Sequence, residues 1–374
     1  MKVGVIIPLS GTYAEAGQEV KRGYELALSQ AGGKVGGRQV QLVFGDAFTP
    51  EATISEAERL ATREKVDIFL GTYATPASQA GSETAARKKL VWVETHAITD
   101  SLTKRGLDNY IRVGPRATDF AVTSVKFITD GLASKLGGQP SVFVEHEDGP
   151  YGTSVAETQM ASLKSAGLSA TEGKHKAAAT DVTDAVLAAK RSNADIWLVT
   201  GYAPDGALLL RTAAAQGYKP KAIVLVGAGD TKSTFEAVGA KDIAGTYVLA
   251  YTSPIVNPQW APGNEKFYAD YKAKFGTDPL GTVANTGYTG MTSFLKLLEA
   301  SAGKTDVASM GKAASTVNVP EGGLPNGWGL KLDADRQNTG IRLLAVQWRP
   351  DGTVPAVWPA AAAKDGQQLQ MSGG

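Results

Sequence analysis

Asp67-Ile68-Phe69-Leu70-Gly71-Thr72-Tyr73-Ala74-Thr75-Pro76-Ala77-Ser78 is the stretch of sequence that decides the fold. Its apolar head predicts a buried strand that ends at Gly71. The pair Thr75-Pro76 predicts a helix start, because Thr is a good N-cap and Pro suits the first helical position. We expect this helix to run through Lys88, so the stretch is the strand-to-helix unit of an α/β fold.

The start of this helix is also a candidate ligand site. The first amides, on Ala77 and Ser78, carry a partial positive charge and could bind a carboxylate, with the hydroxyls of Thr75 and Ser78 as further donors. On this stretch alone, an ordinary capped turn that binds nothing is the commoner case in α/β folds.

The chain outward from this stretch alternates short apolar strands with amphipathic helices, which predicts βαβ units and parallel sheets covered on both faces. The alternation starts afresh after Thr118 and continues to Ala250. We therefore expect an α/β fold of two doubly wound parallel-sheet lobes. The first lobe is predicted to contain Val3–Pro8, 17–31, Gln39–Gly45, Pro50–Glu64, Ile68–Gly71, Pro76–Lys88, Leu90–Glu94 and Tyr110–Val113.

The last third of the chain reads as helices followed by a hairpin of Gly329–Leu332 with Gly340–Trp348, too little for a third domain. We expect it to complete the two lobes, with three crossings that form a hinge and a cleft for a small ligand. The predicted N-terminal lobe is 1–118 plus 252–326, the C-terminal lobe is 119–251 plus 327–358, and 359–374 is a tail that frays or packs loosely.

Composition excludes several classes of function. The 374 residues include 38 basic and 37 acidic side chains, so no strong field favours nucleic acid or an anionic membrane. There is no cysteine, and no apolar run approaches the roughly 20 residues that span a bilayer. The sequence enters a strand at once, so we expect either a cytosolic protein or a mature form whose signal peptide has been removed.

Motifs of catalysis and of metal or cofactor binding are missing from the sequence. It has no Gly-x-Ser-x-Gly elbow, no His-Glu-x-x-His and no Walker motif. Of its three histidines, we expect His175 at the surface and His146 in a solvated or cleft-rim turn, His146-Glu147-Asp148. We predict no catalytic residue, no metal and no cofactor.

Several segments, in this order, resemble a known family: Val3-Gly4-Val5-Ile6-Ile7-Pro8-Leu9-Ser10-Gly11, Gly45-Asp46-Ala47 and Gly152 after Tyr151. The sequence is similar to the type I periplasmic binding proteins, and more narrowly to the leucine/isoleucine/valine-binding receptors of ABC transporters. The resemblance implies a monomeric, periplasmic solute receptor that is not an enzyme, that does not insert into the membrane, and whose partner is a membrane permease.

The same resemblance implies the ligand contacts. In the first lobe they come from the helix start and from the loop after the next strand, and in the second lobe from two tyrosines and an acid that would hold a ligand ammonium. The implied ligand-binding residues are Ala16, Tyr73, Thr75, Ala77, Ser78, Thr95, His96, Ala97, Ile98, Tyr151, Tyr202 and Asp230.

Four positions depart from the family pattern and leave the ligand open. Ala77 replaces a serine, His96 a small residue and Ala16 a large aromatic, while Asp230 lies one residue beyond the family acid. If Asp230 reaches an ammonium group, we expect a branched-chain or aromatic amino acid. If it does not, we expect a keto or aromatic acid such as phenylpyruvate or a benzoate derivative. The competing class is a cytosolic ligand-sensing regulator of the same fold.

Overall fold

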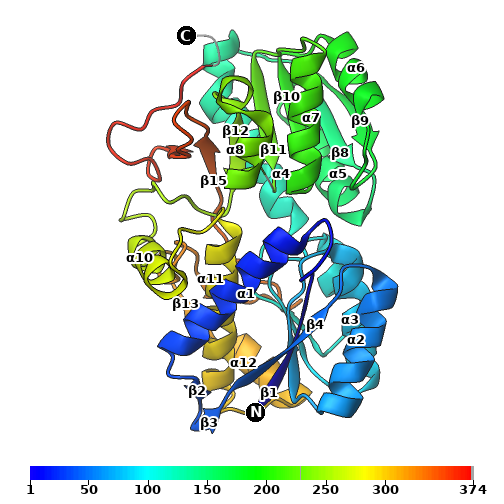
Figure 1. Ribbon diagram of the computed structural model, residues 1–374, viewed down its shortest axis with the longest axis vertical. Helices are drawn as coiled ribbons and strands as arrows, with labels where there is room; N and C mark the ends of the chain where they lie inside the picture. The colour runs from blue at the N-terminus through cyan, green and yellow to red at the C-terminus, as the bar shows by residue number, and fades with distance from the viewer. Residues whose placement is uncertain (228, 372–374) are drawn as a thin grey trace. The chain divides into compact units, whose positions relative to one another are not determined.

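The computed structural model describes residues 1–227 and 229–371, and these form two compact units (Figure 1). Unit 1 contains Met1–Arg116, Ala261–Pro279 and Val283–Arg342. Unit 2 contains Ala117–Trp260, Leu280–Thr282 and the chain from Leu343 onward. Both are α/β units with a parallel sheet, the class of fold that the sequence predicts.

Unit 1 has a five-stranded parallel sheet in the order β4-β1-β5-β6-β7. Its three inner strands are almost wholly buried because helices cover both faces of the sheet. The strands are β1 (Lys2–Ile7), β4 (Gln41–Asp46), β5 (Ile68–Leu70), β6 (Trp92–Glu94) and β7 (Tyr110–Arg112), and two small ribbons pair β2 (Lys34–Val35) with β3 (Arg38–Gln39) and β13 (Asn318–Val319) with β14 (Leu330–Lys331).

Helices α1 (Ala14–Gln30) and α11 (Val283–Ala300) pack together on one face of this sheet, and α2 (Pro50–Arg59) and α3 (Thr75–Arg87) pack on the other (Figure 1). The α1–α11 pair is close because glycines line its contact. A Cβ on Gly23 would lie 2.3 Å from the carbonyl oxygen of Ala284. The remaining helices of unit 1 are α10 (Asn264–Phe275), α12 (Val307–Thr316), η1 (Leu60–Glu64) and η2 (Asp100–Lys104).

Unit 2 has a seven-stranded sheet in the order β16-β15-β12-β11-β10-β8-β9. Five strands are parallel: β8 (Val142–Glu147), β9 (Ala170–His175), β10 (Ile196–Thr200), β11 (Ala222–Val226) and β12 (Tyr247–Ala250). Two antiparallel strands from the end of the chain, β15 (Leu344–Gln347) and β16 (Ala356–Trp358), complete one edge.

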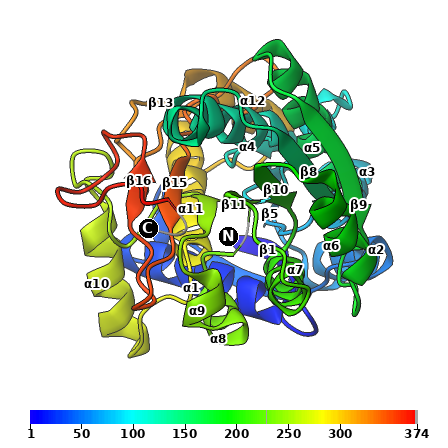
Figure 2. The same ribbon diagram turned by 90° about the horizontal axis from the view of Figure 1, so that it is seen from above.

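The helices of unit 2 also cover both faces of their sheet. Figure 2 shows α5 (Pro150–Ser165) and α6 (Thr183–Ser192) on opposite sides of β8 and β9. Helix α4 (Ala117–Lys126) packs on α5, while α7 (Ala203–Ala215) packs on α6 and α8. The remaining helices are α8 (Lys232–Val238), α9 (Ala240–Ile243), η3 (Phe127–Leu132) and η4 (Ala133–Leu136).

In the last third of the chain, the boundaries of the two units differ from the predicted lobe boundaries. Residues 252–260 belong to unit 2, and residues 327–342 belong to unit 1. Hydrogen bonds explain the second difference, because the side-chain amide of Asn338 donates to Val113 O at 3.0 Å and that of Gln337 to Gly114 O at 3.0 Å. The predicted hairpin forms only beside its turn, where Leu332 and Asn338 make an antiparallel bridge and Thr339 N donates to Lys331 O at 2.8 Å. Beyond Gly340 the second arm leaves the first, and β15 pairs with β12 and β16 instead.

Of the two predicted states of the tail, fraying and loose packing, the described residues up to 371 show the second, because most of them are exposed or half-buried and a few contacts hold them. Ala362 is fully buried. The hydroxyl of Tyr247 donates to Gln370 O at 2.5 Å, and Gln370 N donates to the side chain of Gln347 at 3.0 Å. These bonds satisfy polar groups at the sheet edge, so the tail has fixed partners without any apolar periodicity. The predicted residues 372–374 lie outside the described part of the chain.

Candidate functional site

The first turn of α3 is the predicted anion seat, and the structure corrects its details. The helix begins at Thr75 and its N-cap is Ala74, so Thr75 is not the cap. The Ser78 amide donates to Ala74 O at 3.0 Å, and the Ser78 hydroxyl donates to Glu94 Oε2 at 2.5 Å. Both predicted Ser78 donors are therefore used within unit 1, and Thr75 and Ala77 are the site residues that remain at the helix start.

Glu94 is the residue that sequence reasoning missed. It ends β6, it is fully buried, and it accepts hydrogen bonds from seven different donors. An apolar strand that ends in a carboxylate was the available signal. The donors, at 2.5 to 3.3 Å, are Thr72 N, Thr72 Oγ1, Ser78 Oγ, Trp92 Nε1, Thr95 N, His96 N and Ala97 N.

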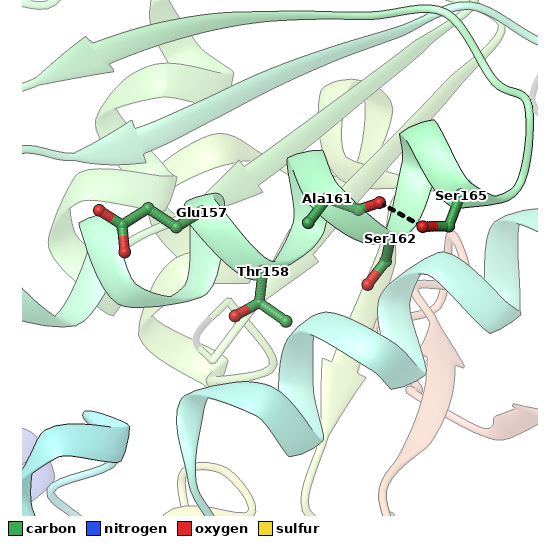
Figure 3. A pocket seen from close by; sticks show the side chains of 5 residues that line it. All are labelled: Glu157, Thr158, Ala161, Ser162 and Ser165. Carbon is green, nitrogen blue, oxygen red and sulfur yellow. Dashed lines mark hydrogen bonds between the residues drawn. The ribbon is translucent and has the colours of Figure 1, made fainter.

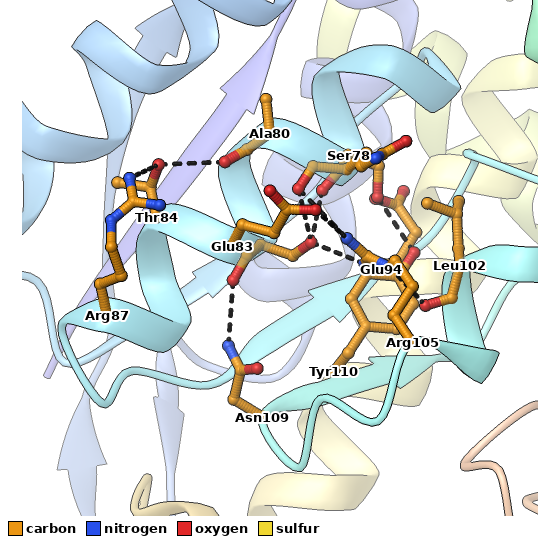
Figure 4. Close-up of polar contacts among 12 residues, drawn as sticks. Ser78, Ala80, Glu83, Thr84, Arg87, Glu94, Leu102, Arg105, Asn109 and Tyr110 are labelled. Carbon is orange, nitrogen blue, oxygen red and sulfur yellow. Dashed lines mark hydrogen bonds and ion pairs between the residues drawn. The ribbon is translucent and has the colours of Figure 1, made fainter.

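These bonds correct a second expectation. The amides of Thr95, His96 and Ala97, at 2.8, 2.9 and 3.1 Å from Glu94 Oε1, are not open to a ligand carboxylate. Figure 4 shows Glu94 beside Ser78 and Tyr110, whose hydroxyl lies 3.0 Å from Ser78 Oγ. The loops after β5 and β6, which are predicted to bind an anion, thus donate hydrogen bonds to the protein's own carboxylate, Glu94.

Arg112 binds the carbonyl groups of the loop after β6, whose amides bind Glu94. Its side chain is fully buried, and Nη1 donates to Ala97 O at 3.2 Å and to Thr99 O at 2.8 Å. Its Nε donates to the side-chain oxygen of Gln337. Ile98 lies between the two bonded carbonyls and is buried, so the loop after β6 is fixed on both sides.

His96 is the predicted site residue with the most distinctive surroundings. Its Nδ1 lies 2.7 Å from Thr95 Oγ1, which lies 2.5 Å from the Tyr24 hydroxyl. Burial lowers the pKa of His96 to about 4, although nearby Glu94 and backbone carbonyls partly oppose this shift, so the ring is neutral at pH 7. Its Nε2 is buried and has no hydrogen-bond partner among the described residues.

Two aromatic positions flank these loops of unit 1. The Tyr73 ring is half-buried, with its centroid 6.2 Å from that of His96. Ala16 lies in the first turn of α1, which begins three residues earlier than predicted, and it is also half-buried. Next to that turn, Tyr13 stacks on Phe48 with ring centroids 4.0 Å apart.

The two predicted tyrosines of unit 2 lie together. Tyr151, in the first turn of α5, and Tyr202, just before α7, have ring centroids 5.1 Å apart. The Tyr151 hydroxyl donates to Val226 O at 3.0 Å. A Cβ at Gly227 would lie 2.0 Å from that hydroxyl, so glycine is required there for the tyrosine to reach β11.

Asp230, the predicted ammonium acceptor, is bound within its own unit. Its Oδ2 accepts from the Thr282 amide at 3.1 Å and from the Thr282 hydroxyl at 2.5 Å. Burial raises the pKa of Asp230, and the two bonds from Thr282 oppose that shift. One oxygen of this carboxylate is therefore already satisfied without a ligand.

The predictions for the other two histidines are wrong. His175 is buried, not at the surface, and its Nδ1 lies 2.9 Å from buried Glu145 Oε1. His146 and Glu147 are buried at the end of β8, because Glu147 accepts from the amides of Gly149 and Gly152 at 2.6 Å each. Burial raises the pKa of Glu147, and these two bonds lower it.

The described part of the chain has neither a cluster of metal ligands nor a helix that could span a membrane. Residues 1–227 and 229–371 contain no group of three or more His, Asp or Glu that could hold a metal ion. None of the helices in those ranges combines the length and apolar character needed to cross a membrane.

The two cavities described lie on the outer helices of unit 2. One of about 460 Å³ follows the exposed side of α5, where it is lined by Glu157, Thr158, Ala161, Ser162 and Ser165 (Figure 3). The other, also about 460 Å³, is lined by residues of α7 to α9 that include Arg211, Lys219 and Lys241. Neither includes a predicted site residue.

All twelve predicted site residues fall where parallel strands of their own unit end. Such loops at the carboxyl ends of strands define a class of α/β proteins that bind small molecules there. This chain belongs to the family of periplasmic binding proteins, whose family model matches residues 1–353.

The chain is also similar in sequence to individual binding proteins. The Leu/Ile/Val-binding protein homolog 7 of Brucella suis biovar 1 (strain 1330) is 36% identical over 370 residues, which cover 97% of this chain and 92% of that protein. Leu/Ile/Val-binding protein homolog 8 of Brucella abortus (strain 2308) is 33% identical over 97% of this chain and 91% of its own length.

Solved structures share the fold at lower identity. The leucine binding protein LivK of Thermotoga maritima MSB8 is 20% identical, with a TM-score of 0.84 over 98% of this chain and 99% of that one. A solute binding protein of an ABC transporter from R. palustris, in complex with 4-hydroxybenzoate, is 23% identical, with a TM-score of 0.84 over 99% and 98%. The family and these proteins are solute-binding proteins rather than enzymes, and they do not support the alternative of a cytosolic regulator.

Proposed function

We propose that this protein is the extracytoplasmic receptor of an ABC importer and that it binds a small carboxylate. The observation that carries the proposal is the position of the twelve predicted site residues at strand ends, in a chain that matches the periplasmic binding family over 353 residues. Relatives by name bind leucine, isoleucine and valine, and structurally similar proteins were solved with isoleucine or hydroxybenzoates.

In this proposal, each unit has its own candidate ligand contacts in the loops at its strand ends. The positive end of α3, at Thr75 and Ala77, is the feature of unit 1 suited to a carboxylate, because the loop after β6 is occupied by Glu94. The rings of Tyr151 and Tyr202 supply apolar contact, since the Tyr151 hydroxyl already has a backbone partner.

Asp230 is the residue that decides whether the ligand carries an ammonium group. A buried ammonium needs a carboxylate partner, and Thr282 uses only one of the two oxygens of Asp230. The proposed ligand is therefore either a branched-chain or aromatic amino acid, or a keto or aromatic acid such as phenylpyruvate or a benzoate derivative.

A binding panel tests the function. Purified protein is unfolded and refolded to remove any ligand that co-purifies, and is then titrated by calorimetry with leucine, phenylalanine, phenylpyruvate, benzoylformate and 4-hydroxybenzoate. We expect saturable binding of at least one acid, which is recovered unchanged. If none of these acids binds, the carboxylate receptor is the wrong function.

The family supports the cellular part of the proposal. We propose that the protein is a periplasmic monomer that delivers its ligand to a membrane permease. Co-purification with the permease, in ligand-dependent fashion, checks that partner.

A further inference from the structure

The buried pair of Glu145 and His175 is the feature of unit 2 that the proposed function leaves unexplained. Glu145 lies on β8 and His175 ends β9, and their side chains are 0% and 2% exposed. His175 Nδ1 lies 2.9 Å from Glu145 Oε1, while Glu145 Oε2 and His175 Nε2 have no hydrogen-bond partner in the described ranges. A buried ionisable group is costly unless a partner compensates it, so each of these two groups needs the other.

The charged groups that face this pair are carboxylates. Strand β8 adds Glu147, in register with His175, and α7 adds Asp205. The buried residues of α5 and α6, which pack on these strands, carry no charge, and Lys174 and Lys176 beside His175 are exposed. In the described part of the chain, no lysine or arginine pairs with any of these three carboxylates, so His175 is the base among them.

Asp205 connects the pair to a candidate ligand contact. Its Oδ2 accepts from the Tyr202 amide at 3.2 Å, and its Oδ1 accepts from the Ala178 amide at 2.8 Å. Burial raises the pKa of Asp205, while the bond from Ala178, the charge of His175 and the bond from Tyr202 lower it. A charge on His175 therefore favours the ionised form of Asp205.

The two bonds of Asp205 require that ionised form. Each oxygen accepts an amide N–H, so a proton on either oxygen would place an O–H donor against an N–H donor. One of the two bonds would then be lost. Because Tyr202 lies immediately before α7, losing its bond would release the backbone that places its ring.

Gly201 brings the same turn into contact with the imidazole. A Cβ at Gly201 would lie 3.4 Å from both His175 Nε2 and Asp205 Cβ, so the backbone before Tyr202 packs directly on His175. The Tyr151 hydroxyl lies 3.4 Å from Gly201 O. The turn thus contacts the buried pair as well as the two tyrosines of the candidate site.

We propose that His175, held by Glu145, is a positioning residue: its charge keeps Asp205 ionised, and Asp205 fixes the backbone of Tyr202 for ligand binding. This inference rests on the proposed function, in which Tyr202 contacts the ligand. Its consequence is an acid limit to binding that His175 sets, because Asp205 releases Tyr202 when it takes up a proton.

The Tyr202 amide reports the charge of Asp205 without any ligand. In protein labelled with nitrogen-15 tyrosine, its NMR signal is the one that disappears in Tyr202→Phe. We expect this signal to shift as the pH falls and Asp205 takes up a proton. In His175→Asn, which keeps a side-chain N–H for Glu145 but carries no charge, the shift should occur at higher pH. The same midpoint in both proteins would overturn the proposal.

His146→Asn is the matched control. His146 is also buried and neighbours Glu145, but its Nε2 lies 2.9 Å from Glu172, which is 51% exposed. Because this substitution leaves His175 in place, we expect the Tyr202 signal to shift at the wild-type pH. A displacement as large as that of His175→Asn would mean that loss of either buried histidine has this effect, and the role of His175 would be refuted.

The wild-type protein provides a second measurement in case His175→Asn does not fold. The chain has three histidines, so the nitrogen-15 signals of the His175 ring are identified by elimination with His96→Gln and His146→Asn. We expect both ring nitrogens to carry protons at the pH where the Tyr202 signal shifts. A neutral ring at that pH cannot supply the charge, and the proposal would fail.

Calorimetry relates this position to binding. Leucine, phenylpyruvate and 4-hydroxybenzoate are titrated at several pH values into the wild type, His175→Asn and His146→Asn. For an acid that binds, we expect His175→Asn to bind about fivefold to tenfold more weakly at a pH between the two Tyr202 midpoints, as for one lost hydrogen bond. This difference should shrink as the pH rises. Equal affinities at that pH would show that the bond to Tyr202 does not serve the ligand.

The outcomes distinguish the two levels of the proposal. If an acid binds but the Tyr202 midpoints coincide, the role of His175 fails while the receptor function stands. If none of the panel acids binds the refolded wild-type protein, the proposed function fails, and the claim that Tyr202 is positioned for a ligand fails with it.

Discussion

Glu94 shows how one residue can organise two loops. Its carboxylate joins the loop after β5, through Thr72 and Ser78, to the loop after β6, through Thr95, His96 and Ala97. Hydrogen bonds from backbone amides to a buried charged acceptor are among the stronger ones in proteins. The geometry of the candidate site therefore depends on a residue that contacts no ligand in the proposal.

Replacing Glu94 by Gln tests this role. The amide has the same shape but brings its own donors toward the donors of the loops, so several bonds are lost. We expect the free energy of unfolding to fall by about 3 kcal/mol, measured by urea denaturation.

Glu83→Gln is the matched control. Glu83 forms a partly exposed ion pair with Arg105 at 3.3 Å, in which the Glu83 side chain is 46% exposed, so solvent weakens the interaction. A loss at Glu94 no larger than that at Glu83 would show that the buried carboxylate does not hold the loops.

The pKa of His96 predicts a pH dependence of stability. Because burial lowers this pKa from 6.5 to about 4, the unfolded chain binds a proton that the folded protein does not bind between these values. Stability from the neutral ring is complete above pH 6.5 and is lost as the pH falls toward 4, by up to about 3 kcal/mol.

The comparison with His96→Gln isolates this contribution, since Glu147, Asp205 and Asp230 titrate in both proteins. Urea denaturation at several pH values should give a steeper loss for the wild type between pH 6.5 and 4. Equal slopes would mean that the folded protein binds the His96 proton as readily as the unfolded chain does.

At the scale of elements, the α1–α11 pair supports the site from behind. Tyr24 of α1 bonds to Thr95, and a Cβ on Gly290 of α11 would lie 2.7 Å from the Thr95 methyl group. The two helices approach closely because Gly23 and Gly287 lack side chains at the contact. The contacts from Tyr24 to Thr95 and from Thr95 to His96 therefore depend on how these helices pack.

Gly23→Ala should disrupt that packing. The new methyl group would lie 2.3 Å from Ala284 O and 2.6 Å from Tyr288 N, and backbone atoms cannot move away cheaply. We expect a loss of about 1–3 kcal/mol in the free energy of unfolding.

Gly206→Ala is the control within a helix of unit 2. Its methyl group would have no neighbour closer than 3.8 Å, and alanine favours a helix by roughly 0.5–1 kcal/mol over glycine. We therefore expect no destabilisation there, and an equal loss at both positions would contradict the packing argument.

Local signals in the sequence predicted elements better than their contacts. The apolar run and Pro76 predicted β5 and α3, with the helix start displaced by one residue. The role of Glu94 could not be predicted, because its seven donors come from two loops that only the fold brings together. For the same reason, the sequence could not show that Glu94 uses the amides of Thr95, His96 and Ala97, in the loop that the family resemblance assigns to the ligand.

At the scale of the whole molecule, the sequence predicts two α/β units but not the division of its last third. The segment 327–342 carries no signal for its partner, because its bonds to Val113 and Gly114 join residues more than two hundred positions apart. Turn residues at 333–338 do predict the short hairpin that forms there, but not that its second arm leaves the first beyond Gly340. Long-range hydrogen bonds decide where this segment packs, and a local pattern does not contain them.

The discontinuity of unit 1 also sets an order of events during synthesis. The ribosome releases α1 early, but its partner α11 begins only at Val283, after the segments Ala117–Trp260 and Leu280–Thr282 of unit 2 have been made. A nascent chain that has not reached α11 exposes the apolar side of α1 and has no helix behind Thr95. Unit 1 therefore cannot complete its fold before the later part of the chain has left the ribosome, and during translation it depends on protection from aggregation and proteolysis.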